Sequence, residues 1–224
     1  MTNLYDGKMA AIFDAMYQTF IDYDEEYSFY NNLIQENQQE YVGLDYSESM
    51  IAIAKERNKN CIFIHGDMRD FQLENPVDSI LITGRSTSYM ITNEDINNTF
   101  ESIYKNLTSN GIVIFDFIDA NRYIPYTKEN PIIIHEAKYE EVNYYRNSNW
   151  KTTSAENFML EWTAQYYTIK EGEKEIIADD FSTVRVFTLN EIQLFLYLNG
   201  FEIIKTIDRK TYAYDTYVIV ARKK

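Results

Sequence analysis

The sequence has little cysteine, no long apolar run and a shortage of basic residues. Its 224 residues include one cysteine, Cys61, so no disulfide can form within the sequence, and a reducing compartment is expected. No apolar run is long enough to span a membrane, and residues 1–10 show no signal-peptide pattern. We therefore predict a cytoplasmic protein.

The shortage of positive charge excludes two classes of partner. The chain has 35 acidic and 21 basic residues, which gives a formal net charge of −14 at pH 7. Nucleic acids and anionic membrane surfaces both require a basic surface on the protein that binds them, so neither is expected. A small molecule is the expected partner, and no metal is predicted.

The first half of the chain alternates helical and strand patterns. Apolar spacing predicts helices over 9–20, 24–37, 47–57 and 92–107, and continuously apolar strands over 41–45, 61–65, 79–83 and 112–118. The 47–57 helix begins with an N-cap serine, and Thr92 with Asp95 forms a capping box at the start of the 92–107 helix. Apolar strands joined by helices favour an α/β fold with a mostly parallel sheet covered on both faces.

The pattern changes after residue 118. Strand-like segments over 132–137, 139–145, 158–169 and 176–187 predict an antiparallel β insertion before the last helix. Thr188 and Glu191 indicate a capping box for that helix, and segments 201–207 and 217–221 predict a closing antiparallel strand pair. The predicted division is therefore N-terminal helices (1–40), an α/β core (41–118), the insertion (119–187) and the closing elements (188–224).

Two acidic segments at strand ends indicate a binding site for a nucleoside. Asp45 ends a strand just before a capped helix, where a carboxylate can accept hydrogen bonds from both hydroxyls of a ribose. Met50 stands one turn into that helix, where it can lie against an adenine ring. At the end of the next strand, Asp67 can accept from an adenine amino group while the Met68 backbone donates to a ring nitrogen. A surface acid favoured by a helix N-terminus, or a plain acidic turn, would explain either segment alone.

Together, these segments resemble class I S-adenosylmethionine-dependent methyltransferases, in which a ribose acid and an adenine-binding aspartate follow in this order. The resemblance continues through residues 78–86, which look like the family's fourth strand and the loop facing the transferred methyl. It implies a Rossmann-like methyltransferase sheet and S-adenosyl-L-methionine as the methyl donor, with S-adenosyl-L-homocysteine as the product. The donor-binding residues that it implies are Asp45, Tyr46, Ser47, Met50, Asp67, Met68, Gly84 and Ser86.

Within this family, the chain is most similar to enzymes that methylate the amino group of deoxyaminosugars and similar small amines. Residues 13–17 with Asp22-Tyr23 resemble their N-terminal lid helices, and residues 86–90 resemble their loop after the fourth strand. The resemblance implies that the lid tyrosines Tyr17 and Tyr23 cover the methyl donor and that Tyr89 approaches the acceptor, which Tyr23 also contacts. Tyr89 or the nearby Asp119 is the candidate catalytic group that relays the proton of the acceptor. Arg85 and Arg122 are the nearest cations for an acceptor that carries phosphates. Core packing, half-exposed lid surface or a strand-end ion pair would explain these residues equally well. His65 and His135 are interpreted as structural.

One part of the family pattern is missing. A member should show, before Tyr41, an apolar strand followed by a glycine-rich turn and a helix, but no Gly-x-Gly occurs anywhere in the sequence. A strand with its crossover needs about 30 residues, and no such stretch separates Asn37 from Tyr41. Either the natural protein has a segment that this sequence lacks, or the protein has lost it and rebuilt its sheet. We favour the first explanation, because the remaining segments agree locally with the fold.

Three functions are compatible with these observations. The first is methyl transfer to a small-molecule amine or hydroxyl, with an amine preferred. The second is a methyltransferase-like binding or scaffold protein without a donor site, which forms a homodimer through the insertion. The third is a nucleotide-cofactor oxidoreductase, in which Asp45 holds a nicotinamide ribose; it ranks last because the Gly66-Asp67 segment has no role there.

Overall fold

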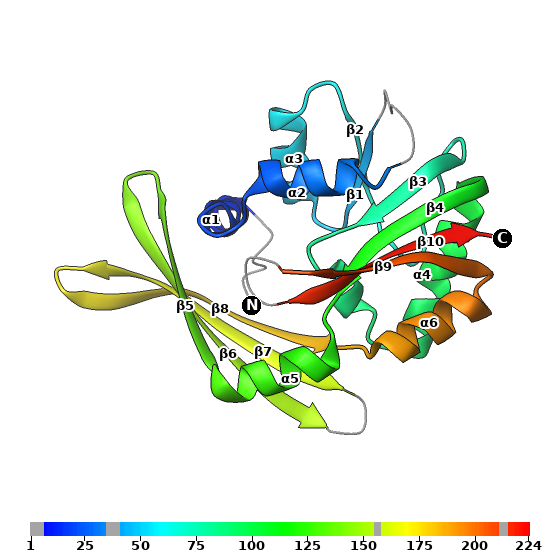
Figure 1. Cartoon of the computed structure of the whole chain (residues 1–224). Helices are drawn as coiled ribbons and strands as arrows, with labels where there is room; N and C mark the ends of the chain where they lie inside the picture. The colour runs from blue at the N-terminus through cyan, green and yellow to red at the C-terminus, as the bar shows by residue number, and fades with distance from the viewer. Residues whose placement is uncertain (1–6, 35–40, 155–157, 211–214) are drawn as a thin grey trace. The chain divides into compact units, whose positions relative to one another are not determined.

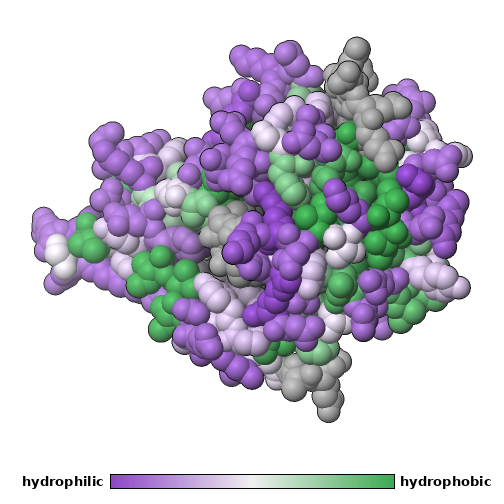
Figure 2. Space-filling view, viewed as in Figure 1, coloured by the Kyte–Doolittle hydropathy of each residue, from purple (hydrophilic) through white to green (hydrophobic). Residues whose placement is uncertain are grey.

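A computed structural model describes residues 7–34, 41–154, 158–210 and 215–224 (Figure 1). The chain divides into two compact units. The first comprises Met1–Asp67, Asn130–Trp150 and Trp162–Ser182, and the second comprises Met68–Glu129, Lys151–Glu161 and Thr183–Lys224. Hydrophilic residues cover most of the face seen in Figure 2, as the high charge of the sequence leads one to expect. No helix among the described residues is long and apolar enough to cross a membrane.

The first unit contains a small parallel sheet. Strands β1 (Val42–Asp45) and β2 (Ile62–His65) pair in parallel, with Asp45 opposite His65, and α3 (Glu48–Arg57) connects them. Gly43 leaves room in β1 for the Phe63 ring, since a Cβ there would lie 2.6 Å from that ring and force it to move. The predicted strand–helix–strand unit of this region is confirmed.

A four-stranded antiparallel sheet supplies the other main part of the first unit. Its strands are β5 (Ile132–Tyr139), β6 (Val142–Ser154), β7 (Met159–Lys170) and β8 (Glu173–Arg185), in that order. The predicted β insertion is therefore confirmed, with strands longer than expected because the connecting turns are tight. Left-handed φ values of 47° and 62° at Glu140 and Glu141 close the first hairpin.

Helix α1 (Gly7–Tyr17) packs on this antiparallel sheet. Its apolar face buries Met9, Ile12 and Met16 against Tyr144, Trp162 and Tyr166 of the sheet. Its opposite side contacts α3: the Asp14 carboxylate accepts from the Arg57 guanidinium, with one N–O distance of 2.8 Å, and Gly7 N donates to Ser49 Oγ. Helix α1 thus joins the β1–α3–β2 segment to the antiparallel sheet. The predicted second helix is shorter than expected, because α2 spans Tyr23–Asn31 and residues 35–37 lie outside the described residues.

The second unit is built on a four-stranded mixed sheet in the order β3-β4-β10-β9. Strands β3 (Val77–Ile82) and β4 (Leu107–Phe117) are parallel, while β10 (Thr216–Lys223) is antiparallel to both β4 and β9 (Phe201–Arg209). Helices α4 (Asn93–Asn106) and α6 (Leu189–Leu198) cover the sheet and complete its core. The closing antiparallel strand pair is confirmed.

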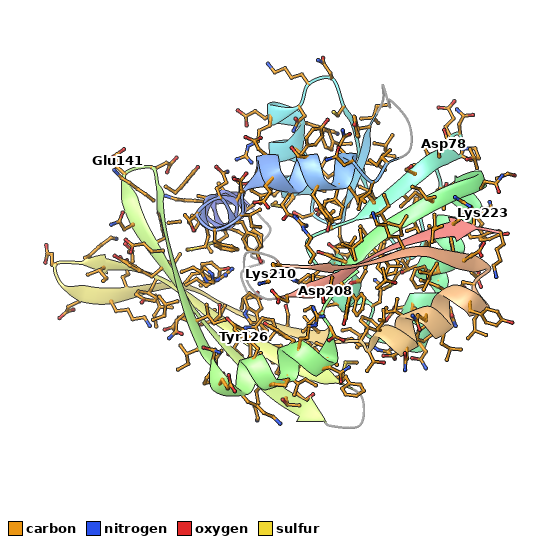
Figure 3. All side chains as sticks on the ribbon, viewed as in Figure 1. Asp78, Tyr126, Glu141, Asp208, Lys210 and Lys223 are labelled. Atoms are coloured by element: carbon orange, nitrogen blue, oxygen red, sulfur yellow. The ribbon has the colours of Figure 1, made fainter. Side chains whose placement is uncertain are left out.

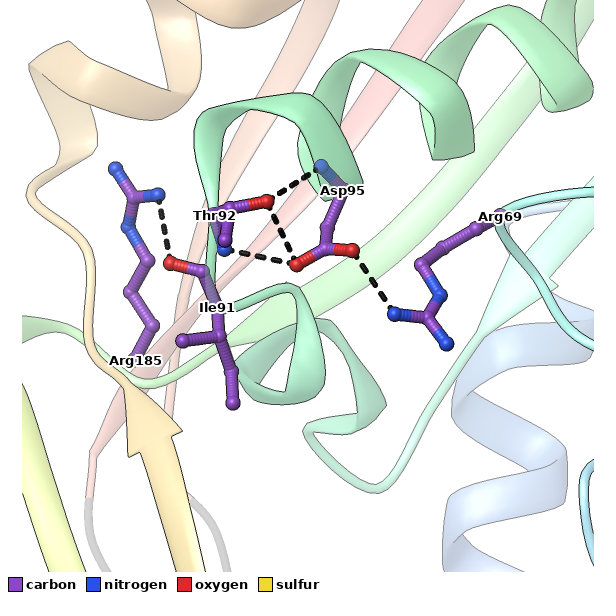
Figure 4. Close-up of polar contacts among 5 residues, drawn as sticks. All are labelled: Arg69, Ile91, Thr92, Asp95 and Arg185. Atoms are coloured by element: carbon purple, nitrogen blue, oxygen red, sulfur yellow. Dashed lines mark hydrogen bonds and ion pairs between the residues drawn. The ribbon is translucent and has the colours of Figure 1, made fainter.

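The two predicted capping boxes have different outcomes. At α4 the capping box is complete, because Asp95 Oδ2 accepts from Thr92 N while Thr92 Oγ1 accepts from Asp95 N (Figure 4). At α6 only half of the predicted box forms. Thr188 Oγ1 accepts from Glu191 N, but the Glu191 carboxylate binds Arg185 at 2.5 Å instead of the cap backbone. A charged partner outcompetes the neutral N–H.

Helix α5 (Ala120–Glu129) is a correction to the sequence analysis, which expected no helix after residue 118 before the last one. It contains Pro125, a residue that normally disfavours a helix interior. Its buried residues Ala120, Tyr123 and Thr127 share one face at helical spacing, and this packing overrides the local preference.

The two parallel strand pairs do not belong to one sheet. Among the described residues, β1 pairs only with β2, and β3 pairs only with β4. A class I sheet has a central strand between these pairs at its topological switch point, and that strand carries the glycine-rich turn. The separation into two sheets is therefore the structural counterpart of the glycine-rich unit that the sequence lacks.

This separation predicts unequal backbone protection. An isolated two-stranded pair is only marginally stable, so β1 and β2 amides should exchange with solvent well before those of β4 and β10. Residue-resolved native-state hydrogen exchange measures the difference, and we expect at least about tenfold faster exchange in β1. Equal protection of Leu44 and Ile114 would show that a continuous sheet includes both.

Candidate functional site

Asp45 and Asp67 lie at the same edge of the β1–β2 sheet. Because the strands are parallel and Asp45, the last residue of β1, is opposite His65, the last residue of β2, both aspartates lie at the carboxyl ends of their strands. Asp45 is exposed, and its Oδ1 accepts from Ser47 N at 2.8 Å. Asp67 is half-buried two residues beyond β2. This edge is where ligands bind in open α/β sheets.

The start of α3 completes this edge. Ser47 is buried and caps the helix, accepting from Met50 N at 3.1 Å, and Met50 is half-buried one turn in. Tyr46 is 74% exposed, and its carbonyl oxygen lies 2.8 Å from His65 Nε2. His65 thus has a structural contact, and it fastens the β1–α3 turn to the end of β2.

Met68 opens a segment that α4 holds by polar contacts. Arg69 donates to Asp95 at 2.9 Å (Figure 4), and Phe71 N donates to Ser102 Oγ at 3.0 Å. Asn106 Oδ1 then accepts from Leu73 N at 2.7 Å. The backbone that was predicted to contact adenine is therefore fixed within the second unit.

The loop after β3 has a constrained backbone. Gly84 and Arg85 both adopt left-handed φ values, 67° and 62°, before the short 3-10 helix η1 (Ser86–Tyr89). The side chain of Asp116, buried near the end of β4, accepts from Arg85 N at 2.9 Å, and Thr87 Oγ1 donates to the Asp116 carbonyl at 2.8 Å. Asp116 was missed by the sequence analysis, which treated 112–118 as an apolar strand. A lone acid inside an apolar run is the signal that would have found it.

Asp119 and Arg122 follow β4, so they lie at the same edge of the second unit's sheet as the loop after β3. Asp119 is buried after β4; burial raises the pKa of its carboxyl, and the Arg122 guanidinium at 3.7 Å lowers it by less. Arg122 also binds Asp208 of β9 through two contacts of 2.8 Å and stacks over Tyr217 (Figure 3 labels Asp208). These contacts give Arg122 a structural role, so it is a weaker candidate for acceptor binding than the sequence suggested.

The predicted lid tyrosines differ in their surroundings. Tyr23 and Tyr89 are 50% and 45% exposed, at the start of α2 and the end of η1. Tyr17 is half-buried at the end of α1, stacked on Phe13 with ring centroids 4.3 Å apart. The Arg146 guanidinium lies 5.4 Å from the centre of its ring.

Arg146 was not recognised from the sequence, although it is a buried cation. It lies on β6, and its Nη2 is 3.0 Å from His135 Nδ1 on β5. Burial lowers the pKa of Arg146, but Tyr166 and Tyr17 raise it by more. Burial, together with the Arg146 charge, lowers the pKa of His135 to about 4, so His135 is neutral at pH 7 and Nδ1 accepts from Arg146. The structural role predicted for His135 agrees with this contact.

Comparison with known proteins identifies the fold. Residues 28–111 match a family model described as a methyltransferase domain. A putative methyltransferase of Bacillus subtilis, YqeM, is 22% identical over 73% of this chain and 65% of its own length. A Streptomyces fradiae dTDP-3-amino-3,6-dideoxy-alpha-D-glucopyranose N,N-dimethyltransferase is 28% identical over 33% of this chain and 29% of its own. The chain thus spans less than two thirds of the length of either relative.

Solved structures give a similar result at low identity. DesVI of Streptomyces venezuelae is 17% identical, with a TM-score of 0.77 over 98% of this chain and 100% of that one. CalS10, an amino pentose methyltransferase from Micromonospora echinaspora, is 14% identical, with a TM-score of 0.73 over 100% of both chains. Residues 28–111 are therefore similar to a methyltransferase domain, and the predicted class I, Rossmann-like methyltransferase fold is confirmed.

The His135–Arg146 contact predicts a pH dependence of stability. His135 has a folded-state pKa below that of an unfolded histidine, so acidification protonates the unfolded chain first. This contribution to stability is complete above about pH 6.5 and is lost as the pH falls towards about 4. We expect roughly 1 kcal/mol from this half-buried group, because solvent screens part of the interaction.

Urea titrations of the wild type and His135→Gln at pH 4.5 to 7.5 measure this contribution. The variant should show a shallower loss of unfolding free energy on acidification. His65→Gln, which removes the other histidine, is the control and should keep the wild-type slope. Parallel curves for the wild type and His135→Gln would contradict the assignment.

Proposed function

We propose that this protein binds S-adenosyl-L-methionine and transfers its methyl group to an amine of a small molecule. The observation that carries the proposal is the position of Asp45 and Asp67 at one edge of a parallel sheet within a methyltransferase domain. In this reading Asp45 accepts from the ribose hydroxyls, Met50 lies against adenine, and Asp67 with the Met68 backbone recognises the adenine edge. Tyr46 and Ser47 shape the turn, and Gly84 and Ser86 face the donor's methyl end.

The residues fit one half of this donor better than the other. Asp45 engages Oδ1 with Ser47 N, so the carboxylate is held in place and its second oxygen can face a ribose. The methionine half of the donor needs close backbone approach at a glycine-rich turn, and the sequence has none. We therefore expect binding to come mainly from the adenosine half.

An amine is the acceptor that this site suits best. The amine nitrogen attacks the donor methyl, the carbon–sulfur bond breaks, and the methylated ammonium then loses a proton. Alignment supplies most of the rate for such an in-line displacement, so no strong base is needed. Tyr89 and Asp119 are our candidates to receive the proton, and burial raises the pKa of the Asp119 carboxyl, which makes its carboxylate a stronger base than an exposed one. The similarity to proteins named as aminosugar methyltransferases supports this acceptor class.

The remaining site assignments also stand as proposals. Tyr17 covers the donor, while Tyr23 and Arg85 contact the acceptor. Arg122 is retained only as a second-choice contact, because Asp208 and Asp119 already bind it. A homodimer formed through the β5–β8 sheet remains a prediction, as does a cytoplasmic location.

A second candidate is a binding protein that holds an adenosine-containing ligand without transferring a methyl group. The separation of β1–β2 from the β3-β4-β10-β9 sheet favours it, because catalysis needs the donor sulfonium fixed within fractions of an ångström. The two candidate functions share the contacts to adenosine and differ only in whether the methyl group is transferred.

A methyl-transfer assay separates them. Purified protein is incubated with methyl-labelled S-adenosyl-L-methionine and a panel of aminosugars and small amines, and labelled product is counted. The proposal expects turnover that falls several-fold in Asp119→Asn, since proton removal is impaired while alignment is kept. Asp78→Asn is the control, because Asp78 begins β3 at the opposite edge, bound to Thr108 Oγ1 at 2.6 Å (Figure 3). A folded protein that binds S-adenosyl-L-homocysteine but transfers no label to any acceptor supports the binding protein instead.

A further inference from the structure

The guanidinium of Arg146 lacks most of the partners that a buried cation needs. The residue is 5% exposed, and its Nε and Nη1 atoms have no hydrogen-bond partner among the described residues. These two nitrogens carry three of the five N–H donors of an arginine. No described carboxylate lies within 4.0 Å of the guanidinium. A buried charge in this state is costly unless something else completes it.

Arg185 shows how this chain completes a comparable arginine. Its side chain is 11% exposed and contacts Glu191 Oε1 at 2.5 Å, Asn93 Oδ1 at 2.9 Å and the Ile91 carbonyl at 3.2 Å (Figure 4 shows the last contact). The lack of hydrogen-bond partners at Arg146 is therefore not a general property of buried arginines in this protein.

The surroundings of Arg146 offer further unused donors. The Tyr166 and Ser148 hydroxyls are buried without a hydrogen-bond partner among the described residues, and both lie on strands that form the Arg146 face of the sheet. Tyr166 and Tyr17 lie close enough to the guanidinium to raise its pKa, through their charge and through weak side-chain hydrogen bonding. Asp180, a half-buried carboxylate on β8, acts on it only over a longer distance. Guanidinium and hydroxyl donors without an acceptor form a set suited to an oxoanion.

Aromatic rings surround the cation on its other sides. The rings of Tyr17, Phe20 and Trp162 have their centres 5.4, 5.9 and 5.9 Å from the Arg146 Cζ atom. Cation–π contacts stabilise the charge but leave its N–H donors unfilled. Tyr17, the last residue of α1, and Phe20, just beyond it, are only half-buried.

We infer that Arg146, Tyr166 and Ser148 form a binding site for a carboxylate or phosphate group. The oxoanion accepts from Nε and Nη1 of Arg146 and from the two hydroxyls, which completes all the unpartnered donors of this face together. His135 keeps the guanidinium in orientation through Nη2.

The two tryptophans of the chain provide a direct reporter. Trp150 and Trp162 have ring centroids 6.0 Å apart, and Trp162 contacts the Arg146 cation. Tryptophan fluorescence is recorded while sodium phosphate or sodium acetate replaces sodium chloride at constant ionic strength, with no methyl donor present. We expect a saturable change with at least one oxoanion, and the stronger of the two identifies the group that the site prefers.

Three variants locate the effect. Arg146→Gln should weaken the oxoanion response at least about tenfold. Tyr166→Phe should weaken it several-fold while leaving the melting temperature unchanged or higher, because it removes a buried hydroxyl that is unpaired in the free protein. Arg185→Gln is the matched control and should keep the wild-type response.

Two results would overturn the inference. One is the absence of any saturable change with either oxoanion in the wild type. The other is an unchanged response in Arg146→Gln or, if that variant fails to fold, an unchanged response in both Tyr166→Phe and Ser148→Ala. Because no methyl donor is used, either result is independent of whether the protein transfers methyl groups.

Discussion

The parallel ladder between β1 and β2 is the interaction on which the proposed donor site depends. It aligns Asp45 with His65 and so places two aspartates after adjacent strand ends. Nothing in the described chain adds a strand to this ladder, because β3 pairs with β4 instead. A two-stranded ladder is weak by itself, and its backbone is held through α3 and through the contact of His65 with the Tyr46 carbonyl. The order of the proposed donor site therefore depends on the stability of the β1–α3–β2 segment.

Helix α1 compensates for part of that weakness. Its apolar face is buried in the antiparallel sheet, and its acidic residue Asp14 binds Arg57 at the end of α3. The same helix ends at Tyr17, beside the buried Arg146. One short helix thus connects the edge proposed to bind the donor, Tyr17, and the buried Arg146 of the insertion. A substitution in its buried face would disturb all three, which is why the variants proposed above avoid that face.

The sequence predicted the order of strands and helices well because their signals are local. Thr92 and Asp95 mark a cap within four residues, and the insertion strands show regular alternation. Asp45 and Asp67 were recognisable because each follows an apolar strand. Helix α5 was missed because Pro125 hides a buried face that only the packing reveals. Arg146 and Asp116 were missed because their importance lies in partners far away in the sequence, such as Tyr17 and Arg85.

We propose that the chain holds the adenosine half of a methyl donor, and its sequence lacks the turn that holds the methionine half. Calorimetric titration with adenosine and with S-adenosyl-L-homocysteine tests it most directly, with Asp45→Ala as the control for the site. We predict dissociation constants within about tenfold of each other, and a loss of about 2 kcal/mol for both ligands in the variant. Binding of S-adenosyl-L-homocysteine about a hundredfold or more tighter than adenosine would contradict the account, since only a functional methionine-binding turn can supply that difference.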